Sequence, residues 1–284
     1  MTADRLEHKF LLPRQEAHAF VTLLDAHLSR HRYSGDGANT LPNARHYATT
    51  VYFDTDKLVM YRRALASPQE NIKLRAREYY DQHPELVETA TDISQLYRPQ
   101  PRLWLELKER SGARTFKQRV GIPKVRVEAF LREHIGGAAD AASRSEAIEV
   151  ESGELSAQEL TGRLLSFVRS EPDPFAVSCV LNYRRASWQG GEDLSMRVTI
   201  DSDLAVFRAA PELLTDDRPL LRERLGTAAY VEPGFIAEVK LRGAPPPWLA
   251  QWLGAHGQCT MDGGKFLLAC GHLYPDVTAA DAGP

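Results

Sequence analysis

Several segments of the sequence alternate apolar and ionic residues with the two-residue period of a β-strand. The stretch 71–79, NIKLRAREY, is the clearest case, because its apolar side chains alternate with Lys73, Arg75 and Arg77. The same alternation places further ionic side chains on one face of their strands: Glu7, Lys9, Glu106, Lys108, Lys117, Arg119, Arg197, Asp201, Glu238 and Lys240. A chain with this pattern is constrained to form a sheet with one apolar face and one ionic face.

Eight segments follow the strand pattern: 5–12, 46–54, 70–80, 102–110, 114–121, 176–188, 194–201 and 235–242. Amphipathic helices are predicted at 13–31, 123–135 and 156–169, with two short helices after Pro247 and after Asp262. The connecting stretches 34–46, 81–101 and 136–155 are predicted to be loops. The predicted fold is mainly β (α+β): a closed, eight-stranded antiparallel β-tunnel with a charged lumen and peripheral helices.

The ionic faces could be the solvated faces of half-buried strands, or they could line the inside of the tunnel. Arg75 and Arg77 would lie about 7 Å apart on one face, and at an effective dielectric constant near 20 their repulsion is roughly 2.4 kcal/mol. Solvated faces usually mix in Ser, Thr, Asn and Gln, whereas these faces are nearly all ionic. We therefore expect the charges to face inward and the apolar faces to face outward, under the helices.

The charges that line this lumen indicate the chemistry of the ligand that it binds. Its repeated positive charges are tolerable only with an anion between them, and a chain of phosphates offers oxygens for charge-assisted hydrogen bonds. The few inward carboxylates would repel phosphate directly, so they are expected to serve as oxygen ligands for Mg²⁺ or Mn²⁺. The predicted ligand is a polyanionic phosphate chain with a divalent metal.

Composition excludes other classes. The 284 residues carry a formal net charge of −3, which argues against a general nucleic-acid binder. No apolar run is long enough for a membrane span or a signal peptide, and the three cysteines have no metal-ligand spacing. We expect a single cytoplasmic domain at 1–275 with a flexible tail at 276–284.

Eight short motifs follow one another along the chain: Glu7-x-Lys9, Val51-Tyr52-Phe53-Asp54, Arg75-x-Arg77, Glu106-Leu107-Lys108, Tyr183-x-Arg185, Arg197-x-Thr199-x-Asp201, Glu238-x-Lys240 and Lys265-Phe266. Their order resembles that of the VTC domain. This is the polyphosphate polymerase domain of the vacuolar transporter chaperone complex, within the triphosphate tunnel metalloenzymes of the CYTH-like superfamily. The resemblance extends over roughly residues 5–270.

The resemblance implies an eight-stranded tunnel that moves the γ-phosphate of ATP onto a polyphosphate chain with Mn²⁺. It implies that the tunnel lining holds phosphates through Lys9, Arg75, Arg77, Lys108, Lys117 and Arg185, with Lys265 near the mouth. It also implies a metal carboxylate, Glu238, assisted by Glu7 and Glu106. The strand pattern adds Lys73, Arg119, Arg197 and Lys240 as phosphate-binding side chains.

Two positions depart from the family pattern. The family shows Ser-Lys-Phe or Ser-Lys-Tyr where this chain has Gly264-Lys265-Phe266, and Asp262 stands where the eukaryotic polymerase has a further lysine. The near-complete lining favours a polymerase. The two departures favour a hydrolase of tripolyphosphate or nucleoside triphosphate, or a non-catalytic sensor of polyphosphate or inositol phosphates. The expected partners are ATP and polyphosphate, with room for an unidentified membrane-protein partner.

Overall fold

The computed structural model describes these parts of the chain: residues 5–31, 45–111, 114–135, 162, 175–190, 195–210, 212–257, 260–261 and 263–277. The main strands form one antiparallel sheet in the order β1-β10-β8-β7-β3-β4-β5-β6. Their bounds are β1 (Arg5–Leu12), β3 (Arg45–Thr55), β4 (Glu70–Gln82), β5 (Arg102–Ser111), β6 (Arg114–Pro123), β7 (Phe175–Gly190), β8 (Met196–Phe207) and β10 (Phe235–Arg242). Two short strands, β2 (Ser29–Arg30) and β9 (Tyr230–Val231), pair with β7 and β8. The predicted strands and the mainly β class are confirmed.

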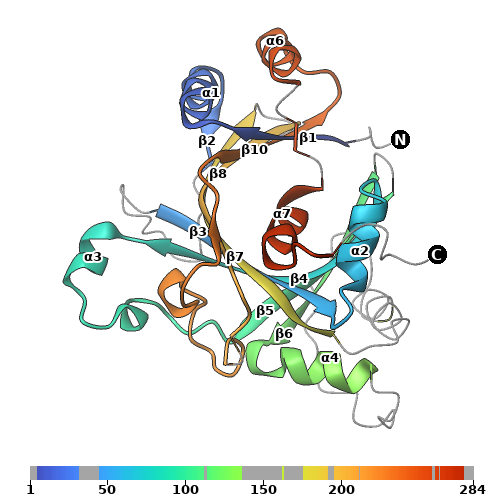
Figure 1. Cartoon of the computed structure of the whole chain (residues 1–284). Helices are drawn as coiled ribbons and strands as arrows, with labels where there is room; N and C mark the ends of the chain where they lie inside the picture. The colour runs from blue at the N-terminus through green and yellow to red at the C-terminus, as the bar shows by residue number, and fades with distance from the viewer. Residues whose placement is uncertain are drawn as a thin grey trace.

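The sheet curls around helix α7 (Gly264–Leu273) but does not close (Figure 1). Strands β1 and β6 are its two ends, and in the described part of the chain no pairing joins them. The free edge of β1 is instead bonded to the segment that leads into α7. The Met261 N–H donates to the Lys9 carbonyl at 2.8 Å, and Phe10 forms an isolated bridge with Thr260. The sheet is therefore not closed as predicted, because this segment occupies the edge to which β6 would have to pair, and the curled sheet is consistent with a tunnel-like fold.

Two helices cover the outer, apolar face of β1, β10 and β8: α1 (Arg14–His27) and α6 (Pro247–Ala255) (Figure 1). Phe20 of α1 and Trp252 of α6 stack with ring centroids 3.7 Å apart, and Trp252 also meets Phe10 edge-on at 5.0 Å. This core buries the outer faces of the strands whose inner faces are ionic. None of the helices in the described residues combines the length and apolar character that crossing a membrane requires.

The other predicted helices differ in their bounds. The helix predicted at 13–31 ends early, because its last residues form β2. The helix predicted at 123–135 is α4 (Val127–Ile135), which follows a 3-10 turn. The helix predicted at 156–169 lies, apart from one residue, outside the described residues, as does most of the predicted tail at 276–284.

Helix α2 (Val59–Ala66) was not predicted from the sequence. A buried carboxylate of the preceding strand, that of Asp54, accepts hydrogen bonds from the first turn of this helix. The Met60 and Tyr61 N–H groups each donate to it at 2.9 Å. Eight residues are too few for a clear helical period. The segment predicted as a loop, 81–101, contains two short helices: α3 (Pro84–Thr89) and a 3-10 turn (Ile93–Leu96).

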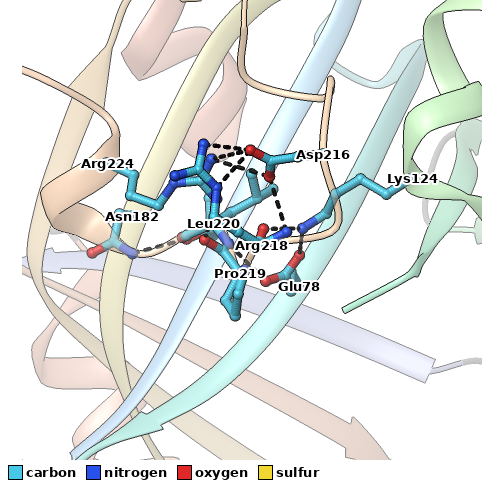
Figure 2. A network of polar contacts seen from close by, with 9 residues as sticks. Glu78, Lys124, Asn182, Asp216, Arg218, Pro219, Leu220 and Arg224 are labelled. Carbon is cyan, nitrogen blue, oxygen red and sulfur yellow. Dashed lines mark hydrogen bonds and ion pairs between the residues drawn. The ribbon is translucent and has the colours of Figure 1, made fainter. Parts of the chain in front are cut away.

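A buried ion pair ties the segment 212–225 to the outer face of β4 (Figure 2). Lys124 Nζ lies 2.7 Å from Glu78 Oε2 and donates to the Arg218 carbonyl at 2.7 Å. Glu78 Oε1 accepts the Leu220 N–H, also at 2.7 Å. The outer face of β4 is thereby closed to solvent, and its basic side chains point to the opposite, inner face.

Candidate functional site

The strand register places the ionic side chains of β1 and β10 against one another. Lys9 is directly opposite Glu238, and Glu7 is directly opposite Lys240. Lys9 Nζ lies 2.9 Å from Glu7 Oε1, and Lys240 Nζ lies 2.5 Å from Glu238 Oε1. Each of these lysines is therefore paired with the carboxylate of its own strand.

The register of β4 and β5 brings a second set together. Arg75 lies opposite Glu106 and donates to its Oε2 from Nε and Nη2, each at 2.8 Å. Lys117 of β6 bonds the other oxygen of Glu106. Lys73 lies directly opposite Lys108. Both oxygens of the one carboxylate in this set are thus occupied, while two lysines face each other.

These faces enclose a cavity of about 330 Å³, within the size range of small-ligand sites. Ten of the predicted site residues line it: Glu7, Lys9, Lys73, Arg75, Arg77, Lys108, Arg185, Glu238, Lys240 and Lys265. The apolar residues between them, such as Leu74, Leu105 and Val239, are fully buried in the core on the other face. The predicted face of each of these strands is therefore confirmed, and the roles of the residues remain predictions.

Helix α7 supplies one wall of the cavity. Gly263 and Gly264, which precede Lys265, both have left-handed backbone torsions, with φ of 74° and 71°, a conformation that glycine adopts without steric cost. Lys265 Nζ then lies 2.7 Å from Oδ2 of the fully buried Asp201. Arg185 binds both oxygens of Asp201, at 2.6 and 2.8 Å. One carboxylate therefore holds two of the cavity's cations, one from the sheet and one from the helix.

Four predicted residues do not line the cavity: Glu106, Lys117, Arg119 and Arg197. Both oxygens of Glu106 are bonded to cations, and its predicted role in assisting a metal remains a prediction. Although burial would raise its pKa, Arg75 and its basic neighbours lower the pKa of Glu106 to about 2. The Arg119 guanidinium lies 4.7 Å from the centroid of the Trp104 ring. Arg197 lies on the inner face of β8 opposite Lys240, outside the cavity.

Several residues of the site were not assigned a role from the sequence. Asn71 and Arg110 line the cavity next to predicted residues of the same strands, and strand alternation alone would have found both. Tyr52 lines it from β3, where it lies opposite Arg75. Asp201 carries the same alternation, but nothing in the sequence indicates which cations it binds.

Burial changes the protonation of the two facing lysines. Desolvation, together with the charges of Lys108, Lys9 and Arg75, lowers the pKa of Lys73 to about 7. Desolvation also lowers the pKa of Lys108 to about 8, although Glu7 opposes the shift. Lys73 Nζ donates to the Gly263 carbonyl at 2.9 Å. Without an anion, this part of the cavity is therefore only partly charged near neutral pH.

Glu7 and Glu238 are the carboxylates placed to hold a metal. Both line the cavity, from the neighbouring strands β1 and β10. Burial alone would raise the pKa of Glu238, but Lys240, the bond with Glu7 and the charge of Lys265 hold it well below its usual range. No cluster of three or more His, Cys, Asp or Glu ligands occurs among the described residues. Two carboxylates fit a Mg²⁺ or Mn²⁺ ion that takes its other ligands from phosphate and water.

Comparison with solved structures gives only distant likenesses. The chain resembles PH1819 protein from Pyrococcus horikoshii OT3, with a TM-score of 0.34 and 8% identity over 89% of this chain and 86% of that one. It also resembles the Schizosaccharomyces pombe Mediator head module, with a TM-score of 0.31 and 12% identity over 89% of this chain and 90% of that one. No curated protein matches the chain.

The family comparison is more specific. The family model described as the VTC domain matches residues 4–271, nearly the whole chain. The match extends from β1, with Glu7 and Lys9, to helix α7, with Lys265. The domain with its basic cavity thus belongs to the VTC domain family, whose members are related to polyphosphate polymerases.

Proposed function

We propose that the cavity binds ATP and the end of a polyphosphate chain, and that the protein transfers the γ-phosphoryl group of ATP to that chain with a divalent metal. The observation that carries this proposal is the charge of the lining. Nine Lys or Arg side chains and only two carboxylates line the cavity of about 330 Å³. Such an excess of cations in a partly desolvated space attracts a polyanion, which would offset their mutual repulsion.

The lining suits a chain of phosphates better than an isolated anion. Along β4, Lys73, Arg75 and Arg77 follow at two-residue intervals, so they repeat about every 7 Å on one face. A row of this length presents successive donors to successive phosphate groups. Arg185 and Lys265 face the row from β7 and α7.

The transfer itself needs little from the protein besides position and charge. A terminal oxygen of the polyphosphate chain attacks the γ-phosphorus of ATP. One new P–O bond forms, the bond between the γ-phosphorus and the bridging oxygen breaks, and ADP leaves with the electron pair. The attacking oxygen is already ionised, so no general base is required, and the basic side chains hold the two phosphate groups in line and offset their repulsion.

Glu238 and Glu7 would hold the metal. When bound, a divalent cation supplies positive charge to the phosphate oxygens whose negative charge grows during transfer. The two carboxylates lie on the β1–β10 side of the cavity, next to Lys9 and Lys240, and would hold the cation there.

Purified protein incubated with ATP and Mn²⁺ tests the proposal, with products resolved on a gel and free phosphate measured in parallel. We expect a ladder of polyphosphate and an equivalent amount of ADP. Arg77→Ala should abolish the ladder, whereas Glu109→Gln, an exposed position on the outer face of β5, should leave it unchanged.

Two other results would contradict the polymerase assignment. Free phosphate without a ladder would indicate a hydrolase. Retained binding of tripolyphosphate with neither product would indicate a sensor. Gly264, whose family counterpart is serine, is the described position at which such a difference would be sought first.

A further inference from the structure

The inner face of β4 continues beyond the cavity. Lys73, Arg75 and Arg77 line the cavity, and Tyr79 follows on the same face by strand alternation. Tyr79 is 43% exposed, and it lies toward the end of β4 that leads into α3 (Figure 1). A large exposed aromatic ring thus stands about 7 Å beyond the last basic side chain of the row.

Tyr79 is one of three rings at this end of the inner face. The His46 ring of β3 is stacked against it, with centroids 5.5 Å apart and an interplanar angle of 12°. Asp81 fixes that imidazole through a contact of 2.8 Å to Nδ1. Trp104 of β5 lies directly opposite Arg77. We call His46, Tyr79 and Trp104 the aromatic rim.

The other end of the same strand is different. Asn71 and Gln69 line the cavity there, and Arg110 lies opposite Asn71. None of these three side chains is aromatic. The inner face of β4 is therefore asymmetric along its length: the three rings lie beyond the cavity at one end, and polar or basic side chains line the cavity at the other.

Arg77 connects the aromatic rim to the basic row. Its Nη1 donates to the Tyr79 hydroxyl at 3.0 Å, and its Nε donates to Thr50 Oγ1 at 3.2 Å. The guanidinium also lies 5.8 Å from the centroid of the Tyr79 ring. One side chain thus contacts an exposed ring and lines the phosphate cavity, the juxtaposition that a ligand with both a base and phosphates requires.

We propose that the aromatic rim is the nucleobase subsite of a nucleoside triphosphate whose phosphates lie along Arg77 and Arg75 toward Lys73. This inference rests on the proposed function and adds a direction to it. The γ-phosphate points toward Lys73 and Lys9, which flank the start of α7, and the acceptor chain enters from the opposite end. Aromatic rings stack on any base, so the subsite favours nucleotides over inorganic phosphates without selecting one base.

The test compares two ligands on the same variants. Affinities for ATP and for inorganic tripolyphosphate are measured by calorimetry in EDTA, where binding proceeds without metal-dependent turnover. Tyr79→Ala should weaken ATP binding roughly tenfold, while tripolyphosphate binding changes by no more than about twofold. Tyr79→Phe keeps the ring and should retain the ATP affinity. Phe116→Ala removes an equally exposed ring, 52% exposed, from the other face of the sheet and should affect neither ligand.

The alternatives give distinct results. An equal loss for both ligands in Tyr79→Ala would mean that Tyr79 only positions Arg77, and it would overturn the subsite. No loss for either ligand would overturn it as well, because the base would then lie elsewhere. In both cases wild-type binding of tripolyphosphate leaves the proposed function standing. Failure of the wild-type protein to bind either ligand would instead overturn the proposed function, and the subsite with it.

Discussion

Lys73 of β4 lies directly opposite Lys108 of β5 on the inner face of the sheet, and no ion pair joins Lys73 to a carboxylate in the described part of the chain. Like charges directly opposite each other destabilise a sheet. Burial lowers the pKa of both ammonium groups, to about 7 and about 8. The empty cavity reduces this repulsion by losing protons, and a bound polyanion would restore them.

The first prediction is that tripolyphosphate binding takes up protons and weakens as the pH rises. Above about pH 7, Lys73 is increasingly neutral in the free protein, so through this one group each further pH unit should cost at most roughly tenfold in affinity. Lys73→Arg keeps its charge throughout and should flatten the profile. Calorimetry of both proteins from pH 6 to pH 9 in EDTA measures the difference, and identical profiles would contradict the assignment.

The lowered pKa of Lys73 also affects the stability of the ligand-free protein, which should rise with pH while the affinity for tripolyphosphate falls. The folded-state pKa of Lys73 lies below the ordinary lysine value of 10.5, so between about pH 7 and pH 10 the unfolded chain binds more protons. Raising the pH through this window should therefore increase the free energy of unfolding. Urea unfolding at pH 7 and pH 9 should show a larger increase in wild type than in Lys73→Met, which has no proton to lose.

The second prediction concerns the metal. Glu238→Gln removes a negative charge from among the basic side chains but keeps the shape, so metal-dependent turnover should be lost while tripolyphosphate still binds in EDTA, at least as tightly as it binds to wild type. Glu109→Gln is the matched control on the outer face. An unchanged metal requirement together with lower stability would show that Glu238 only pairs with Lys240, its partner at 2.5 Å.

The third prediction tests the carboxylate that joins the sheet to α7. Asp201→Asn leaves Arg185 and Lys265 buried without their shared anion, which should lower the free energy of unfolding by about 3–5 kcal/mol. Asp203→Asn, an exposed position on the same strand, should change it by less than about 0.5 kcal/mol.

Tripolyphosphate supplies a second readout for this variant. Because it brings negative charge to Arg185 and Lys265, it should raise the unfolding midpoint of Asp201→Asn more than that of wild type. Equal shifts in the two proteins would mean that the ligand does not reach these side chains.

The fourth prediction separates the outer face from the cavity. Lys124→Met leaves the buried carboxylate of Glu78 without its cation (Figure 2) and should cost about 3–5 kcal/mol of stability. Adding Glu78→Gln, which keeps an acceptor for the Leu220 N–H, should recover much of that loss. Neither variant should change the affinity for tripolyphosphate, since the pair lies on the opposite face of β4. A change in affinity would indicate that the two faces are coupled.

Local alternation was enough to predict the eight strands and which face of each is ionic, because the period of a strand depends only on neighbouring residues. It could not predict closure. The free edge of β1 is bonded to residues 260–261, which lie about 250 residues further along the chain. Helix α2 escaped detection because its N-terminus is bonded by a residue of the preceding strand, Asp54.

The site was predictable to the same extent. Strand alternation correctly placed Arg119 and Arg197 on the inner face of the sheet. It does not indicate how far along the curled sheet each side chain lies, and both side chains lie outside the cavity. Arg75 and Lys117 occupy both carboxylate oxygens of Glu106 because of the register of three strands. The hydrophobic pattern of a single strand does not determine that register. Strand alternation therefore predicted most of the side chains that line the cavity, but not their pairing.

The central claim is that the cavity is built for several linked phosphates. It is tested most directly by the thermal unfolding midpoint in tripolyphosphate and in sulfate at matched ionic strength. A ligand that binds only the folded state raises the midpoint, and general screening acts equally in both salts. We expect a clearly larger increase with tripolyphosphate, which Arg77→Ala reduces. Equal increases with the two anions, unaffected by Arg77→Ala, would contradict the account.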